Sequence, residues 1–126
     1  MDPNWNDSQP IYRQLRDRVV DMILEGVVED GGALPSVRNV AAEYKLNPLT
    51  VLKAYQQLVD DDLVEKKRGR GMYVKEGARQ RLLSDERKRF LATEWPRIVE
   101  TVRRLGLAPE ELINGMDKAA FDGGAK

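Results

Sequence analysis

The chain has 126 residues, of which 41% are apolar and 33% charged, and its 21 Lys and Arg balance its 21 Asp and Glu. This size fits one compact domain, or a small domain with an appendage, and excludes a second large domain. The sequence has no cysteine and no histidine, which excludes disulfides, thiolate nucleophiles, imidazole bases and the commonest zinc ligands. We therefore expect no enzyme, no metal site and no cofactor.

The charges are distributed unevenly along the chain. Residues 1–63 carry 6 Lys and Arg against 11 Asp and Glu, whereas residues 64–104 carry 13 against 6. A basic segment favours a polyphosphate partner, because neutralising phosphates releases condensed counterions. A solvated basic helix at 79–89 would account for part of this excess. No apolar run approaches the roughly 18 residues of a membrane span, and residues 1–5 do not resemble a signal peptide, so we expect a cytoplasmic location and no membrane partner.

The first predicted helix covers residues 9–25, where apolar side chains recur three and four positions apart. These side chains are Ile11, Leu15, Val19, Met22 and Ile23. Ser8 is placed to cap the start of this helix, and Gly26 is placed to end it.

A second short helix is predicted from Val37 to about Tyr44, with Ser36 as its cap. Val40 and Ala41 are its expected core residues, together with either Tyr44 or Leu46.

The third predicted helix has the strongest start signal, because Asn47 is a favoured N-cap and Pro48 occupies the favoured first helical position. It extends to about residue 60. Its inward stripe consists of Val51, Ala54, Tyr55, Leu58 and Val59. Two short helices joined by a tight turn, the second with a free N-terminus, are typical of a helix-turn-helix. The acidic residues 60–62 that follow are expected to form a solvated turn.

Two short strands are predicted at residues 64–67 and 72–75. The segment between them, Arg68-Gly69-Arg70-Gly71, contains two glycines that permit the positive φ angles of a tight hairpin. The result is a wing with a basic tip. A nucleotide-binding loop is disfavoured, because no third glycine and no helix start follow.

The remainder, residues 77–126, is predicted to be helical and separate in character. Apolar residues step by four and three along a heptad seam: Leu91, Trp95, Ile98, Val102 and Leu105. Such a seam favours a partner helix, with an intramolecular core as the alternative.

Pro96 interrupts this seam and predicts either a kink near Glu94 or two successive helices, the second capped by Thr93. Gly106 is expected to end this region. A last helix is expected to open at Pro109 and to carry apolar residues, Leu112 and Ile113 among them. Residues 123–126 are expected to be disordered.

Four motifs within residues 10–74 resemble the GntR family of bacterial regulators. They are Pro10-Ile11-Tyr12 with Gln14-Leu15, Leu34-Pro35-Ser36-x-Arg38, Asn47-Pro48-x-Thr50-Val51-x-Lys53-Ala54-Tyr55-x-x-Leu58, and Gly69-x-Gly71-Met72-Tyr73-Val74. The short helical tail resembles that of the YtrA subfamily, in which it serves dimerisation. The implied fold is mainly α with a small β-hairpin: a winged helix-turn-helix domain at 1–76 and a helical dimerisation region at 77–126.

The resemblance implies a sequence-specific transcriptional regulator that binds a palindromic operator in double-stranded DNA as a homodimer, typically as a repressor of transporter genes. The predicted DNA contacts are Ser36, Arg38, Asn47, Pro48, Leu49, Thr50, Lys53, Lys67, Arg68, Gly69, Arg70 and Gly71. The predicted dimerisation residues are Leu91, Trp95, Ile98, Val102, Leu105, Leu112 and Ile113.

Several predicted contacts have simpler interpretations. Arg38 is also placed to pair with Glu43 on the surface, while Lys53 and Thr50 are also compatible with an ordinary helix surface. Tyr55 is expected in the core rather than stacked on bases.

Three positions depart from the family pattern. Relatives usually carry a polar residue at the position of Leu49 and often at that of Leu52. The leucines reduce hydrogen-bonded readout and leave packing on a thymine methyl as a substitute. Asp62 stands where relatives commonly place glycine, so we expect a left-handed backbone there at a small cost in stability.

Two other functions are compatible with the residues. One is a protein-interaction module that combines a degenerate winged helix with the heptad seam. The other is an added response to a small-molecule effector, whose identity is unknown. The tail is too small to enclose a typical ligand pocket of about 300 to 1,000 Å³.

Overall fold

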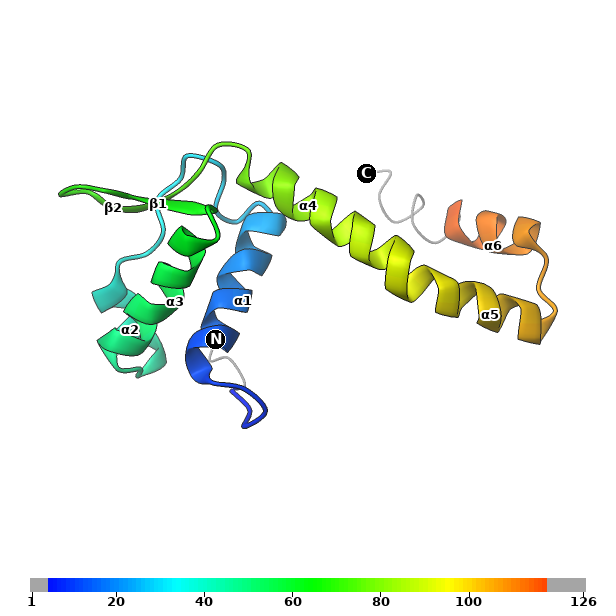
Figure 1. Cartoon of the computed structure of the whole chain (residues 1–126), viewed down its shortest axis with the longest axis horizontal. Helices are drawn as coiled ribbons and strands as arrows, with labels where there is room; N and C mark the ends of the chain where they lie inside the picture. The colour runs from blue at the N-terminus through cyan, green and yellow to red at the C-terminus, as the bar shows by residue number, and fades with distance from the viewer. Residues whose placement is uncertain (1–4, 118–126) are drawn as a thin grey trace. The chain divides into compact units, whose positions relative to one another are not determined.

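The computed structural model describes residues 5–117. Its internal contacts divide the chain into two compact units, Met1–Ser84 and Asp85–Lys126, which are described separately (Figure 1). We predicted a boundary after residue 76. The division falls later because Ala78, the first residue of the helix that follows the wing, is buried in the core of the N-terminal unit. The predicted disorder at 123–126 lies outside the described residues.

The N-terminal unit consists of three helices and a hairpin in chain order. They are α1 (Ile11–Leu24), α2 (Val37–Tyr44), α3 (Pro48–Asp60), β1 (Val64–Lys67) and β2 (Gly71–Val74). The two strands are antiparallel, with Val64 opposite Val74 and Lys67 opposite Gly71. A single bridge between Ala33 and Tyr73 ties the loop after α1 to the hairpin.

The start of α1 differs from the prediction that Ser8 caps it. The hydroxyl of Ser8 donates instead to the side chain of Asn6, and Pro10 occupies the cap position with no side-chain hydrogen bond. Gln14 ties the preceding segment down: its amide donates to the carbonyl of Gln9 at 2.7 Å. The predicted end is confirmed, because Gly26 has φ +81° directly after Glu25, the C-cap of the helix.

The caps of α2 and α3 are as predicted. Ser36 Oγ accepts a hydrogen bond from the Asn39 N–H at 3.0 Å, and Asn47 Oδ1 accepts one from the Leu49 N–H at 2.9 Å. Between the helices the chain turns at Lys45, whose left-handed backbone (φ 55°) ends α2. Local side-chain to backbone bonds therefore define both ends of the turn.

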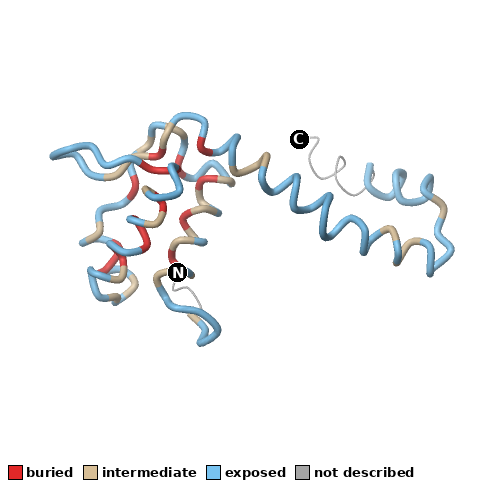
Figure 2. The backbone as a smooth tube through the Cα atoms, viewed as in Figure 1, coloured by how far each residue is buried: buried red, intermediate tan, exposed pale blue. Residues whose placement is uncertain are grey.

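The core of the N-terminal unit lies where α1, α3 and the base of the hairpin meet (Figure 2). Val51, Ala54 and Leu58 on α3 are fully buried against Leu15 and Ile23 on α1. The inward stripe predicted for α3 is thus confirmed, with Val59 half-buried at its edge.

The helix α4 (Ala78–Arg89) begins in the N-terminal unit and ends in the C-terminal one. A π-helical turn, η1 (Phe90–Glu94), follows and leads into α5 (Trp95–Leu105). The Trp95 N–H donates to the Phe90 carbonyl, five residues back. Because proline lacks an N–H and its ring clashes with the carbonyl four residues earlier, the wider turn accommodates Pro96. Thr93 lies inside this turn, so the prediction that it caps a new helix is wrong.

The C-terminal unit ends with α6 (Pro109–Met116), which opens at the predicted proline. Gly106, with φ +70°, ends α5 as expected. The Glu111 carboxylate accepts a hydrogen bond from the Ala108 N–H at 2.9 Å and so secures the first turn of α6. Within residues 85–117, no side chain is buried.

Across the described residues 5–117, no helix has the length and apolar character needed to cross a bilayer. The same part of the chain brings together no group of three or more acidic side chains that could hold a metal ion.

Candidate DNA-binding surface

The outward face of α3 carries four residues at helical spacing, opposite the buried stripe. They are Leu49, Leu52, Lys53 and Gln56, all exposed. The first residues of α3 are exposed as well, so its N-terminal end is open to solvent. That end carries the positive pole of the helix dipole and is suited to a phosphate or to the edge of a base pair.

Tyr55 fixes the start of α2 relative to α3. Its side chain is only 1% exposed, and its hydroxyl donates to the Pro35 carbonyl at 2.7 Å, directly before Ser36. Burial, with a smaller contribution from Tyr44, raises the pKa of Tyr55 to about 12, so the phenol stays a neutral donor. The prediction that Tyr55 belongs to the core is confirmed. Ser36 and Arg38 are exposed next to this fixed point.

Lys53 has a partner that the sequence did not reveal. Its Nζ lies 4.1 Å from the centre of the Tyr12 ring on α1. A cation over an aromatic face at an exposed site is worth about 0.5 to 1 kcal/mol, enough to favour one direction for a long side chain. Tyr12 stood in a recognised motif, but nothing in its spacing placed it beside α3.

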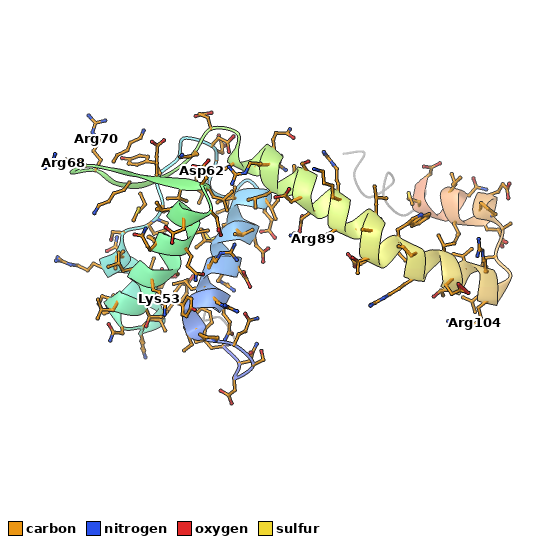
Figure 3. All side chains as sticks on the ribbon, viewed as in Figure 1. Lys53, Asp62, Arg68, Arg70, Arg89 and Arg104 are labelled. Carbon is orange, nitrogen blue, oxygen red and sulfur yellow. The ribbon has the colours of Figure 1, made fainter. Side chains whose placement is uncertain are left out.

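The wing presents two arginines at its free end. Figure 3 shows Arg68 and Arg70 extending from the tip of the hairpin into solvent. Gly69 and Gly71 have φ +75° and +107°, so the turn uses both predicted glycines. Lys67 lies over the Tyr73 ring at 4.6 Å.

Within the part of the chain that the structure describes, none of the predicted cationic contacts forms an ion pair with a carboxylate. None of the ion pairs formed within residues 5–117 involves Arg38, Lys53, Lys67, Arg68 or Arg70. In particular, Arg38 does not pair with Glu43 in this part of the chain. No carboxylate of this part of the chain neutralises these five charges, which can therefore attract phosphates, although Lys53 and Lys67 also lie over aromatic rings.

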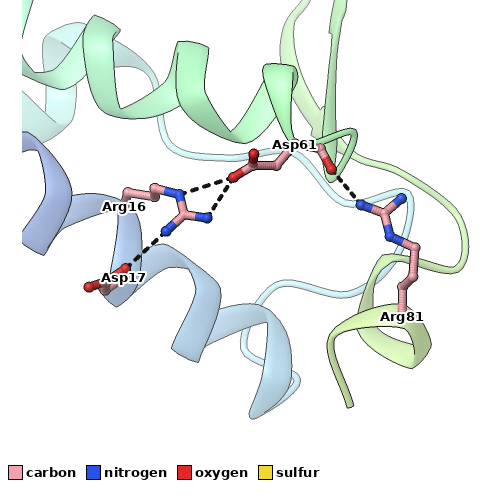
Figure 4. Close-up of polar contacts among 4 residues, drawn as sticks. All are labelled: Arg16, Asp17, Asp61 and Arg81. Carbon is pink, nitrogen blue, oxygen red and sulfur yellow. Dashed lines mark hydrogen bonds and ion pairs between the residues drawn. The ribbon is translucent and has the colours of Figure 1, made fainter. Parts of the chain in front are cut away.

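The acidic turn after α3 is exposed but not simply solvated. Asp61 accepts from Arg16 Nε at 3.2 Å, Arg16 also contacts Asp17, and Arg81 donates to the Asp61 carbonyl (Figure 4). The expectation of a merely solvated turn is thus incomplete, because Asp61 joins three elements.

Asp62 has the predicted left-handed backbone, with φ 63°. Its carboxylate pairs with Lys75 and, at 3.4 Å, with Arg81. The hydrogen bond and charge of Lys75, followed by Arg81, hold the pKa of Asp62 below its ordinary value. Arg79 likewise serves the fold, since its Nε donates to the Leu24 carbonyl at 2.9 Å. Part of the basic excess at 79–89 is therefore used inside the N-terminal unit.

Residues from three elements border one hollow of about 250 Å³, and among them Ser36, Arg70 and Gly71 are predicted contacts. Ser36 contributes from the cap of α2, Leu52 from α3, and Arg70 with Gly71 from the wing. The structure thus brings the start of α2, the outer face of α3 and the wing to a single surface.

An open, capped helix beside a basic hairpin, on one surface with a second helix start, defines a winged helix-turn-helix DNA-binding protein. Residues 11–74 match the model of the family described as bacterial regulatory proteins, gntR family. The chain belongs to the GntR family and is a DNA-binding transcriptional regulator, not an enzyme.

Similar proteins support this assignment along the whole chain. The chain is 34% identical to "Uncharacterized HTH-type transcriptional regulator YhcF" of Bacillus subtilis (strain 168), over 98% of this chain and 100% of that protein. It is 41% identical over 76 residues to "HTH-type transcriptional repressor YtrA" of the same organism, covering 60% of this chain and 58% of YtrA. The predicted likeness to the YtrA subfamily is thereby supported.

A solved GntR family transcriptional regulator from Listeria monocytogenes superposes with a TM-score of 0.67 at 29% identity, covering 90% of this chain and 98% of that one. The predicted fold class, mainly helical with a winged helix-turn-helix, is confirmed.

Proposed function

We propose that this regulator is a cytoplasmic repressor that binds a palindromic operator in double-stranded DNA as a homodimer. The observation that carries the homodimer is the apolar surface of the C-terminal unit. Large apolar side chains are exposed there from Phe90 to Met116: Phe90, Leu91, Trp95, Ile98, Leu105, Leu107, Leu112, Ile113 and Met116. Large apolar side chains exposed in such number on one small unit support an interface there.

A second copy of the chain is the partner that this surface fits. Helices with apolar residues at heptad spacing pack against like helices, and a twofold interface uses the same surface of both copies. The π-helical turn shapes the surface, because it brings the rings of Phe90 and Trp95 to 6.4 Å. Phe90 therefore joins the proposed interface of Leu91, Trp95, Ile98, Val102, Leu105, Leu112 and Ile113, although the heptad pattern did not include it.

Twofold symmetry of the protein implies twofold symmetry of the site. The two copies of α3 would enter successive major grooves about 34 Å apart, with Arg38 on phosphates or base edges, Lys53 on phosphates, and the wing tips on the flanking backbone or minor groove. Repression is supported by the name of the relative YtrA. An interaction module without DNA binding is not favoured, because the cations of α2, α3 and the wing remain unpaired within residues 5–117.

The test starts with selection of binding sites from random DNA by the full chain. We expect an inverted repeat, a dimer in sedimentation equilibrium, and an affinity that falls by about three to five orders of magnitude between 50 and 200 mM salt. Inserting five base pairs between the half-sites should abolish tight binding, since it rotates one half-site to the opposite side of the duplex. A spacer of changed sequence but equal length is the control. Selection of a single asymmetric half-site by a monomer would contradict the proposal.

A further inference from the structure

The two leucines on the outward face of α3 stand out at the centre of the DNA-binding surface. Leu49 is 70% exposed and Leu52 is 44% exposed. Three residues apart on a helix, they form one apolar strip beside Lys53. A single exposed leucine is unremarkable, but an adjacent pair in the first turns of a recognition helix occupies the positions nearest to base edges.

The surroundings of the strip are also apolar. Leu52 lines the hollow of about 250 Å³ together with Pro35, Val37 and Met72, while Lys66 and Arg70 contribute charge. A second hollow, of about 620 Å³, borders the start of α3 and is lined mainly by apolar residues of α2 and the turn, with Arg38 as its charged member. Leu52 thus borders a largely apolar hollow, and Pro48, directly before Leu49, borders another; the charged residues of both hollows suit phosphates.

The polar side chains on the same face of α3 already have partners. Lys53 lies over the Tyr12 ring, and Gln56 Nε2 donates to Asp60 Oδ1 at 3.2 Å. Direct readout by hydrogen bonds would first require these contacts to break. The two leucines have no such competing contact to give up.

We propose that Leu49 and Leu52 read the C5-methyl groups of thymines in the major groove of each half-site. The thymine methyl is the apolar group that an unmodified base pair presents in that groove. The cations around the strip position the helix on phosphates, and the leucines then discriminate thymine by contact with its methyl group. This inference rests on the proposed function, because it requires α3 to enter the major groove of an operator.

Deoxyuridine provides the test, since it lacks the C5-methyl group but keeps every hydrogen-bonding group of thymine. Thymines of the selected operator are replaced one at a time, and the dissociation constant of the full chain is measured by gel shift. We expect a loss of about fourfold per methyl group at one or two positions in each half-site, the factor that corresponds to one buried methyl-sized group.

Variants connect each methyl group to a side chain. Leu49→Ala and Leu52→Ala should bind the thymine operator more weakly and respond less to deoxyuridine at their own position. Leu49→Met, which keeps an apolar side chain of similar volume, should retain the response. Val27→Ala is the matched control, because Val27 is apolar and 66% exposed on the loop after α1; it should respond like the unchanged protein. Circular dichroism verifies that each variant is folded.

Equal affinity of the unchanged protein for thymine and deoxyuridine operators would overturn this inference alone. Undiminished methyl sensitivity in both alanine variants would do the same. If the protein selects no inverted repeat, the proposed function fails first, and that outcome is recognised before any thymine is replaced.

Discussion

The two units of this regulator differ in how far a single chain buries their apolar side chains. In the N-terminal unit, Val51, Ala54 and Leu58 are fully buried within one chain. In the C-terminal unit, residues 85–117 contain no buried side chain, and large apolar residues such as Trp95 and Leu105 face solvent. A single copy of the chain therefore buries the core of the first unit, whereas it leaves the large apolar side chains of the second unit exposed. Stability should depend on protein concentration for the second unit and not for the first.

The largest effect is expected when a charge is introduced into the exposed apolar surface of the C-terminal unit. Ile98→Asp places a carboxylate in the proposed interface twice, once from each copy, and should weaken dimerisation by about a thousandfold or more, because a buried unpaired charge is very costly. Sedimentation equilibrium measures the change, with Glu100→Ala, also on α5, as the control. A dimer of unchanged strength would show that this surface is not the interface.

The next largest effect is expected when a side chain in the core of the N-terminal unit is shortened. Leu58→Ala should lower the free energy of unfolding of the N-terminal unit by about 2 to 5 kcal/mol, since the lost packing leaves a cavity that the neighbours fill only in part. Urea denaturation reports the loss. The exposed Val27→Ala should change this free energy by no more than about 0.5 kcal/mol. Similar values for both variants would contradict the assigned core.

A smaller effect separates binding from folding. Arg38→Ala should weaken operator binding by about 5- to 150-fold, the range for loss of a base contact, and should leave the melting temperature unchanged because Arg38 is exposed. Arg104→Ala removes the same charge from a residue of the C-terminal unit that is not among the proposed DNA contacts, and it should have little effect. An unfolded Arg38→Ala protein would contradict the placement of this residue.

The smallest effect concerns Asp62. Asp62→Asn keeps a side chain that tolerates the left-handed backbone but removes the charge that faces Lys75 and Arg81. The pKa of Asp62 is lowered in the folded protein, so the unfolded state binds more protons at acidic pH. The stabilisation is therefore present above the ordinary pKa and is lost as pH falls through the lowered one. Thermal melts should show a slightly less stable variant at neutral pH, converging with the unchanged protein in acid.

Local signals predicted most of the N-terminal unit. Ser36 and Asn47 cap their helices through bonds to residues two or three positions away, and a sequence contains that information. The cap assigned to Ser8 failed because Asn6 binds its hydroxyl. Distances between elements were not predictable: Lys53 meets Tyr12, and Asp61 meets Arg16, across α1 and α3.

The C-terminal unit shows the same limit in another form. The position of Pro96 predicted an interruption of the helix. That the interruption is a π-helical turn depends on backbone adjustments that the heptad pattern does not contain. In that turn the ring of Phe90 lies beside the ring of Trp95, so Phe90 is added to the residues of the exposed apolar surface that the heptad pattern predicted.

The hydrogen bond from Tyr55 to the Pro35 carbonyl has a consequence for how the protein meets DNA. It joins the middle of one helix to the residue before the cap of another, so the two helix starts behave as a preorganised pair. Association at this surface then loses little conformational entropy, because the backbone is already in place. Differences in affinity between operators should accordingly reflect the base pairs themselves rather than the cost of ordering the protein.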